Sequence, residues 1–271
     1  MNILDKIIAA KHLEVASRRA VQPLEQLKER PLYDQTTLSL RQSIANSTNY
    51  GIIAEFKRKS PSQSDINLAA DPAVVGPGYE KAGAAGLSVL TDQDFFGAHA
   101  TDIGTIREMV NLPIIRKDFM VDTYQIHEAK AMGADAILLI AACLDTALLD
   151  QLATTAKSLG LEVLCEIHDE AEIAKISPAV DIVGVNNRNL KDFSVSISQS
   201  LRIGELLPPQ FLKISESGIE DAQSIIRLKQ AGFGGFLIGT YFMRQPDPAA
   251  ALASFIAEVR RIDNIYQDAI A

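Results

Sequence analysis

The stretch PIIRKDFMVDTYQIHEAKAMGADAILLIA, residues 113–141, holds two short apolar runs separated by a segment that mixes polar and apolar residues. The first run ends at Lys117, and the second begins shortly after Gly133. Glycine often stands just past the end of a helix, because it adopts the left-handed backbone conformation at little cost. The stretch therefore predicts a strand, a helix that ends before Gly133, and a second strand.

The same unit recurs from about Gly51 onward, and its apolar runs are apolar on both faces, as in a parallel sheet covered by helices. Eight such runs occur, at residues 51–56, 86–91, 113–117, 135–141, 162–167, 181–185, 211–215 and 234–239. Eight strands that alternate with helices are typical of the α/β fold called a (β/α)8 or TIM barrel. The alternative is an open, doubly wound sheet. That fold more often has a glycine-rich turn after its first strand, and residues 57–64, KRKSPSQS, contain no glycine.

Residues 1–47 precede the repeating unit. They contain apolar residues at helical spacing, including Ile3 and Ile7, and a second short helical segment at residues 24–29. We expect a helical N-terminal extension that caps one end of the barrel. Since no low-complexity linker divides the chain, residues 1–271 are predicted to form a single barrel domain.

The composition is that of a globular domain. Of 271 residues, 47% are hydrophobic and 22% are charged, and the formal net charge of −8 disfavours non-specific binding to nucleic acid or to anionic membranes. The apolar run at residues 136–144 is far shorter than the roughly 20 residues that span a bilayer. The N-terminus lacks the uninterrupted apolar segment of a signal peptide. We therefore expect a cytoplasmic protein.

Charged and polar side chains stand where the predicted strands end. In a barrel these ends line the active site, although a single charge at a strand end usually meets only solvent. Glu55 and Lys57 are two residues apart and therefore point to the same side. The other polar residues at strand ends are Lys117, Glu166, Asn186, Arg188 and Glu216. Acids and bases gathered in one concavity are suited to proton transfer, so this rim is predicted to be a general acid–base site.

The seventh and eighth predicted strands are followed by Ser217 and Gly218 and by Gly239 and Thr240. In TIM barrels the loops at these positions usually bind phosphate, and a helix expected from residue 219 would add free N–H groups. The alternative is a pair of ordinary tight turns. His168 follows Glu166 by two residues and could join the site, but HDE, residues 168–170, is interpreted as the start of the next helix. The four histidines show no metal-ligand spacing.

In several segments the chain resembles the indole-3-glycerol phosphate synthase family. These segments cover all eight predicted strands: IIAEFKRKSPS (52–62), LSVLTDQDFFG (87–97), residues 112–142, LCEIHDE (164–170), GVNNRNL (184–190), KISESGI (213–219) and FLIGTYFM (236–243). The resemblance implies a lyase of tryptophan biosynthesis, a carboxy-lyase. Its reaction closes the ring of 1-(2-carboxyphenylamino)-1-deoxyribulose 5-phosphate to give indole-3-glycerol phosphate, with loss of CO₂ and water.

The same resemblance implies roles for residues. Lys117 would be the principal general acid, Lys57 a second lysine, and Glu166 the base or the group that stabilises the developing cation. The residues that would orient these groups are Glu55, Asn186 and Glu216. The residues that would bind substrate are Ser60 and Arg188 for polar groups, Ser217, Gly218, Gly239 and Thr240 for phosphate, and Phe96, Phe119 and Leu138 for the anthranilate ring. The reaction needs no metal, nicotinamide or flavin, so no cofactor is expected. The expected partner is a small phosphorylated substrate of a monomeric enzyme.

Two other functions fit parts of the pattern. A Schiff-base aldolase acting on a phosphosugar would use Lys117 or Lys57 as its nucleophile and would share the phosphate site. A non-catalytic barrel that binds a phosphorylated metabolite would keep the fold without turnover. Trapping a lysine with borohydride would reveal the aldolase, and tight binding without turnover would reveal the binding protein.

Overall fold

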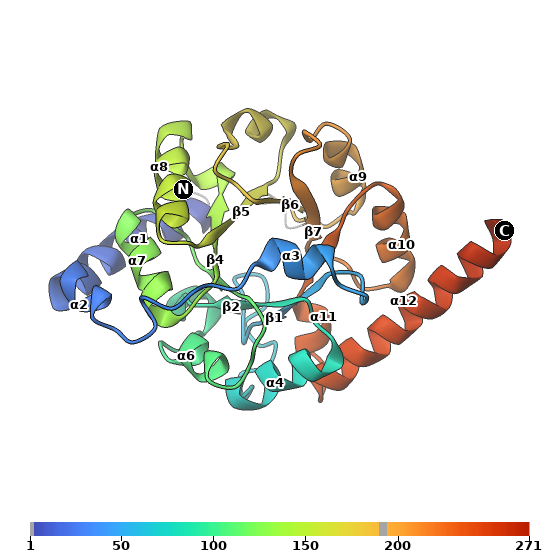
Figure 1. Ribbon diagram of the computed structural model, residues 1–271, viewed down its shortest axis with the longest axis horizontal. Coiled ribbons are helices and arrows are strands. Elements are labelled where there is room, and N and C mark those ends of the chain that lie inside the picture. The colour runs from blue at the N-terminus through green and yellow to red at the C-terminus, as the bar shows by residue number, and fades with distance from the viewer. Residues whose placement is uncertain (1–2, 190–193, 271) are drawn as a thin grey trace.

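The computed structural model describes residues 3–189 and 194–270, and its centre is a closed barrel of eight parallel strands (Figure 1). Each strand pairs with the next in chain order, and β8 pairs with β1. The strands are β1 Ile52–Phe56, β2 Gly86–Leu90, β3 Ile114–Lys117, β4 Ala136–Ile140, β5 Glu162–Ile167, β6 Ile182–Asn186, β7 Leu212–Glu216 and β8 Gly235–Ile238. This confirms the predicted (β/α)8 barrel.

Helices follow the strands and surround the barrel. They are α4 Pro72–Ala82, α5 Gln93–Phe96, α6 Asp102–Arg107, α7 Thr123–Met132, α8 Thr146–Ser158, α9 Ser198–Gly204, α10 Ala222–Gln230, α11 Thr240–Met243 and α12 Pro248–Ile270, with 3-10 turns at η1 Ala141–Cys143 and η2 Glu170–Lys175. Helix α7 begins with a capping box built on Asp122 and ends at Gly133, whose φ of 84° is left-handed. The glycine after the helix therefore has the predicted role.

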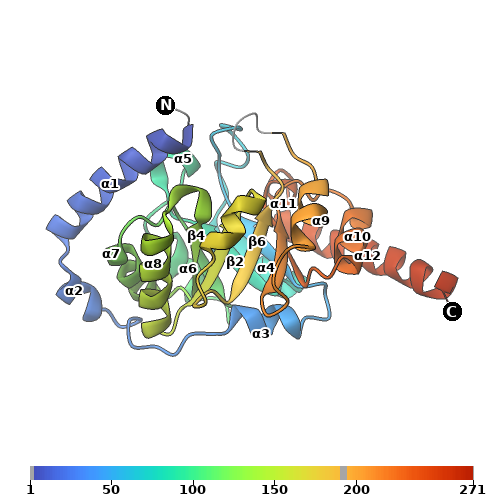
Figure 2. The same cartoon turned by 90° about the horizontal axis from the view of Figure 1, so that it is seen from above.

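The first 47 residues contain α1 Ile3–Val21, α2 Leu24–Lys28 and α3 Leu40–Ala45. Figure 2 shows α1 running along the outside of the barrel while α3 lies across the end opposite α5. Leu40 and Ile44 of α3 are buried with Ile53 and Ile214 in the barrel interior, so α3 closes the end at which the strands begin. The N-terminus of α1 lies near the other end, where the strands finish.

The strands are buried on both faces, as their apolar sequences require. Every residue of β1, β2 and β4 is buried. One apolar cluster fills the barrel, and a larger one lies between the sheet and the outer helices. In the described part of the chain, no helix is both long and apolar enough to cross a membrane.

Candidate active site

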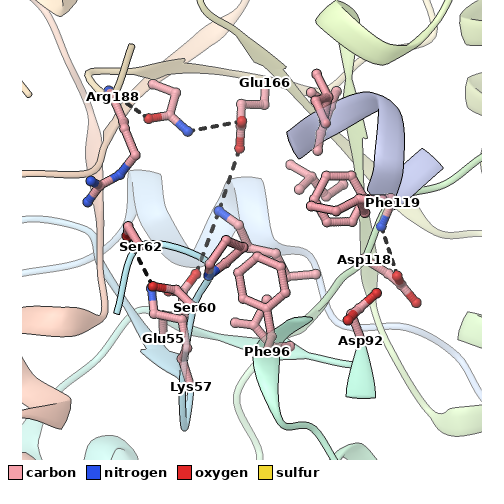
Figure 3. Close-up of a pocket in the computed structure, with 18 of the residues that line it drawn as sticks. Glu55, Lys57, Ser60, Ser62, Asp92, Phe96, Asp118, Phe119, Glu166 and Arg188 are labelled. Carbon is pink, nitrogen blue, oxygen red and sulfur yellow. Dashed lines mark hydrogen bonds and ion pairs between the residues drawn. The ribbon is translucent and has the colours of Figure 1, made fainter. Parts of the chain in front are cut away.

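A cavity opens at the end of the barrel where the strands finish (Figure 3). Eleven of the residues predicted for the site line it: Glu55, Lys57, Ser60, Phe96, Lys117, Phe119, Leu138, Glu166, Asn186, Arg188 and Thr240. A neighbouring cavity, which also contacts Glu55, Lys57, Arg188 and Thr240, is lined by Ser217, Gly218 and Gly239. The remaining predicted residue, Glu216, contacts Lys117 directly. The structure therefore brings all the predicted site residues to one end of the barrel.

Lys117 stands at the centre of a cluster of carboxylates. Its Nζ lies 2.7 Å from Oε2 of Glu216, 3.6 Å from Oε2 of Glu55 and 3.7 Å from Oε2 of Glu166. Lys57 lies beside it, with Nζ 2.5 Å from Oε1 of Glu55. These side chains come from the ends of β1, β3, β5 and β7, so alternation along the strands places them all inward.

The burial of this cluster separates the protonation states of its members. Burial lowers the pKa of Lys117, but the three carboxylates around it raise that pKa above its ordinary value. Burial raises the pKa of Glu216 to about 7 despite the adjacent ammonium group. Burial also acts to raise the pKa of Glu166, yet the hydrogen bond from His168 and the charge of Lys117 hold it at about 2. The site thus combines a protonated lysine with an ionised glutamate, as proton transfer in both directions requires.

Residues at the end of β6 hold Glu166 in place. Asn186 donates through Nδ2 to Oε1 of Glu166 at 3.0 Å, and the backbone N–H of Arg188 donates to Oδ1 of Asn186 at 2.9 Å. These contacts fix both the amide group and the carboxylate. Leu190, the last residue of the GVNNRNL motif, lies outside the described residues.

His168 belongs to the cavity, the alternative that was set aside in favour of a helix start. Its imidazole lines the cavity, and Nε2 lies 3.1 Å from Oε1 of Glu166. The turn that was expected to begin at HDE is capped by Asp169, one residue later, and is the 3-10 helix η2. His168 is therefore the last residue before the turn, and its side chain points into the site.

The turns after β7 and β8 form the cavity predicted to bind phosphate. Ser217 and Gly218 both have positive φ, 67° and 69°, which gives this turn an unusual backbone shape. Helix α10 begins at Ala222, three residues later than expected, and the side chain of Asp221 accepts from the N–H of Ser224 at its N-terminus. The backbone of the two turns, with Lys57, Arg188 and Arg244, therefore lines this cavity.

The apolar side of the main cavity comes from several elements. The rings of Phe96 and Phe119 lie 6.1 Å apart at 40°, and Leu138 is buried close to Phe119. Residues of α1 also line the cavity, Ile3, Leu4 and Ile7, which the sequence analysis did not assign to it. A flat aromatic group fits between such apolar surfaces.

Two glycines make room for the carboxylates, a role that was predicted for neither. A Cβ atom at Gly184 would overlap Oε1 of Glu216, and one at Gly239 would lie 2.5 Å from Oε1 of Glu55. Gly239 was assigned only to phosphate. The available signal was a glycine within an apolar strand, which often marks a close approach by another group.

A buried ionic cluster next to the cavity was missed as well. Lys11 of α1 is 1% exposed, and its Nζ lies 2.8 Å from Oδ2 of Asp92 and 2.9 Å from Oδ1 of Asp118. Both aspartates line the cavity. Lys11 lies between Ile7 and Val15 on the buried face of α1, so a lysine on an apolar stripe was the signal.

Comparisons with known proteins identify similar sequences and folds. A family model described as Indole-3-glycerol phosphate synthase matches residues 4–255. A protein of that name from Bacteroides thetaiotaomicron is 45% identical over 259 residues, which cover 96% of this chain and 99% of the relative. Another, from Albidiferax ferrireducens, is 42% identical over 261 residues and covers 94% and 98%. A solved mutant tryptophan synthase alpha-subunit from Pyrococcus furiosus, 12% identical, has a TM-score of 0.57 over 78% of this chain and 97% of its own, and shows the fold alone.

Proposed function

The chain belongs to the indole-3-glycerol phosphate synthase family, and from that premise we propose that Lys117 is its principal general acid and Glu166 its base. The reaction is that of a carbon–carbon lyase in tryptophan biosynthesis, which closes an indole ring with loss of CO₂ and water. The observation that supports the proposed roles is the contact of the Lys117 ammonium group with the carboxylates of Glu55, Glu166 and Glu216 in one cavity. The comparisons do not favour the Schiff-base aldolase or the non-catalytic barrel.

The proton balance of the reaction matches these groups. The ring carbon that carries the carboxylate bonds to the substrate carbonyl carbon, and the carbonyl oxygen takes a proton from an ammonium group. CO₂ then leaves, and the bonding electrons restore the aromatic ring. The new hydroxyl group departs as water with a second proton, and Glu166 takes a proton from the neighbouring carbon. Lys117 stands where it can deliver the first proton, and it is held protonated by its carboxylates.

The other site residues would bind and orient the substrate. Lys57 contacts Glu55 and lines both cavities, so it suits a second acid close to the phosphate group. The proposed orienting residues are Glu55, Asn186 and Glu216. The proposed substrate contacts are Ser60 and Arg188 for polar groups, the turns at Ser217, Gly218, Gly239 and Thr240 for phosphate, and Phe96, Phe119 and Leu138 for the aromatic ring. Phosphate held away from the reacting carbon supplies binding energy that orients the closing chain.

We also propose that the protein acts as a monomer with one domain. Both cavities lie at the end of one barrel, where the side chains that line them come from that barrel and from α1. Burial of Leu40 and Ile44 inside the barrel supports folding of the N-terminal extension together with the rest.

The test is the Lys117→Ala variant in an assay that follows indole fluorescence as the substrate closes. Removal of a general acid lowers turnover by about 10²- to 10⁴-fold, so we expect kcat to fall at least that far. The far-ultraviolet circular dichroism spectrum and the thermal protection by substrate should be kept. Lys157→Ala, on the exposed outer helix α8, is the matched control and should have wild-type turnover. Near wild-type activity in Lys117→Ala would refute the assignment.

A further inference from the structure

The two oxygens of the Glu166 carboxylate have different surroundings. Oε1 lies 3.0 Å from Nδ2 of Asn186 and 3.1 Å from Nε2 of His168. Oε2 lies 3.7 Å from Nζ of Lys117. One oxygen therefore faces two nitrogen atoms, and the other faces the proposed general acid.

His168 is itself held by its surroundings. Its side chain is 8% exposed, its backbone N–H donates to Oε2 of Glu172 at 2.7 Å, and its carbonyl oxygen accepts from Nε2 of Gln199 at 2.6 Å. The imidazole stands between two carboxylates, with Glu166 at Nε2 and Glu172 3.9 Å from Nδ1. An imidazole ring between two negative charges is stabilised in its protonated form, in which both nitrogens are donors.

We propose that His168 is a positioning residue for ring closure: its imidazole, with Nε2 3.1 Å from Oε1 of Glu166, pairs with that oxygen, and this ion-pair contact, together with the hydrogen bond from Asn186, leaves Oε2 as the oxygen that accepts the substrate proton. No bond to the substrate forms or breaks at His168. The inference rests on the proposed role of Glu166, which it deepens by naming the reactive oxygen and the group that selects it. A carboxylate with one oxygen fixed by two donors cannot rotate freely, so the other oxygen keeps its direction toward the substrate.

This arrangement has a consequence for the pH profile. Burial lowers the pKa of His168, but the hydrogen bond and charge of Glu166 raise it above its ordinary value, with Glu172 and Glu216 adding to the effect. The groups that face the pair are these carboxylates and the ammonium group of Lys117. Without the imidazolium, the pKa of Glu166 should rise, because the interaction with His168 is the largest influence that lowers this pKa against the effect of burial. The acid limb of kcat/KM should then move to higher pH.

The experiment compares His168→Gln with His168→Leu. Glutamine keeps an N–H donor near the position of Nε2 but cannot be protonated, whereas leucine has a similar volume and no donor. One hydrogen bond to a charged group corresponds to about a 10- to 100-fold change, so His168→Leu should lower kcat by that factor with KM within about threefold. His168→Gln should keep most of kcat, and His12→Leu, at an exposed position of α1, should behave as wild type.

If His168 has only a structural role, His168→Leu should lower the unfolding temperature without moving the acid limb of the kcat/KM profile. That result would overturn the inference. So would a His168→Leu variant with wild-type kcat. A nuclear magnetic resonance titration of the wild-type imidazole tests the contact independently of turnover, since Glu166→Gln should lower the His168 midpoint. An unchanged midpoint overturns the inference even if the enzyme is active. If Glu166→Gln lowers the midpoint but the wild-type protein forms no indole-3-glycerol phosphate, the contact stands and the proposed function is wrong.

Discussion

Replacing Lys11 with methionine removes a buried ammonium group and leaves carboxylates facing an apolar side chain. Nζ of Lys11 lies 2.7 Å from Glu14, 2.8 Å from Asp92 and 2.9 Å from Asp118. The side chains of Asp92 and Asp118 are 3% and 0% exposed, so neither gains water when the lysine is lost. Breaking a buried ion pair from one side costs about 3–5 kcal/mol, because the remaining charge is buried without its partner.

The expected loss lies at the lower end of that range. Asp118 keeps Arg116, whose Nη2 lies 3.0 Å away, and a hydrogen bond from Thr91 at 2.8 Å. Asp92 keeps only its helix-capping bond to the N–H of Phe95 among the contacts described, so most of the cost falls there. About 3 kcal/mol corresponds to a fall in unfolding temperature of roughly 6–12 °C for a chain of this size. Turnover should fall as well, because Asp92 caps α5, the short helix whose last residue, Phe96, lines the cavity.

Thermal unfolding followed by circular dichroism measures this effect. Arg261→Met is the control, because that side chain is 61% exposed and pairs with Glu258 at the surface, so no change in unfolding temperature should be resolved. Adding Asp92→Asn to Lys11→Met should recover part of the loss, since the second change removes the uncompensated charge. A Lys11→Met variant as stable as the control would refute the view that this cluster holds α1 against the barrel.

Two further variants test the rim itself. Gly184→Ala puts a methyl group where Oε1 of Glu216 lies and 3.0 Å from its Cδ, so we expect the free energy of unfolding to fall by about 1–3 kcal/mol and kcat to fall at least tenfold. The control is Gly104→Ala, in a helix with nothing within 4 Å, which should raise the free energy of unfolding by about 0.5–1 kcal/mol and leave activity unchanged. Equal effects of the two changes would contradict the packing argument. Glu216→Gln tests the raised pKa of Glu216 through the pH dependence of stability. In the wild type, Glu216 of the folded state binds a proton between pH 4.5 and 7 that the unfolded chain does not bind, so wild-type stability falls as pH rises through that window. Urea unfolding at pH 5 and 7.5 should show the variant gaining relative to wild type at the higher pH, and parallel profiles would count against a raised pKa.

The fold could be predicted because the strands are largely apolar on both faces and a glycine follows several of the helices, as Gly83 follows α4 and Gly133 follows α7. Those signals are local, and residues 113–141 contain one full copy of them. The site residues at strand ends could be placed for the same reason, since alternation along a strand decides which side chains point inward. Lys57, Lys117 and Glu166 therefore converge in the structure as the spacing indicated.

What the sequence did not show depends on contacts between distant segments. Lys11 meets Asp92 and Asp118 only because α1 packs against the rim, and helical spacing alone says nothing about that partner. His168 is a different case, because it stands one residue past β5 and two residues after Glu166, as Lys57 stands one residue past β1 and two residues after Glu55, so alternation would have placed it in the site. Asp169 caps the next turn, so residues 168–170 did indicate where that turn begins. For that reason His168, which stands before the cap, was assigned to the turn and not to the cavity.

The three glutamates of the rim show how one residue type takes different roles in one cavity. Three buried carboxylates lie close together in this cavity, and like charges held so near one another raise the pKa of the carboxylate that is least compensated. Glu166 has nitrogen atoms near both of its oxygens, those of Asn186 and His168 at Oε1 and that of Lys117 at Oε2, whereas Oε1 of Glu216 is buried with no hydrogen-bond partner among the described residues. Burial is therefore least compensated at Glu216, where the pKa is raised. With the pKa raised at Glu216 and lowered at Glu166, Glu166 is the carboxylate suited to accept a proton from the substrate while Lys117 remains charged and able to donate.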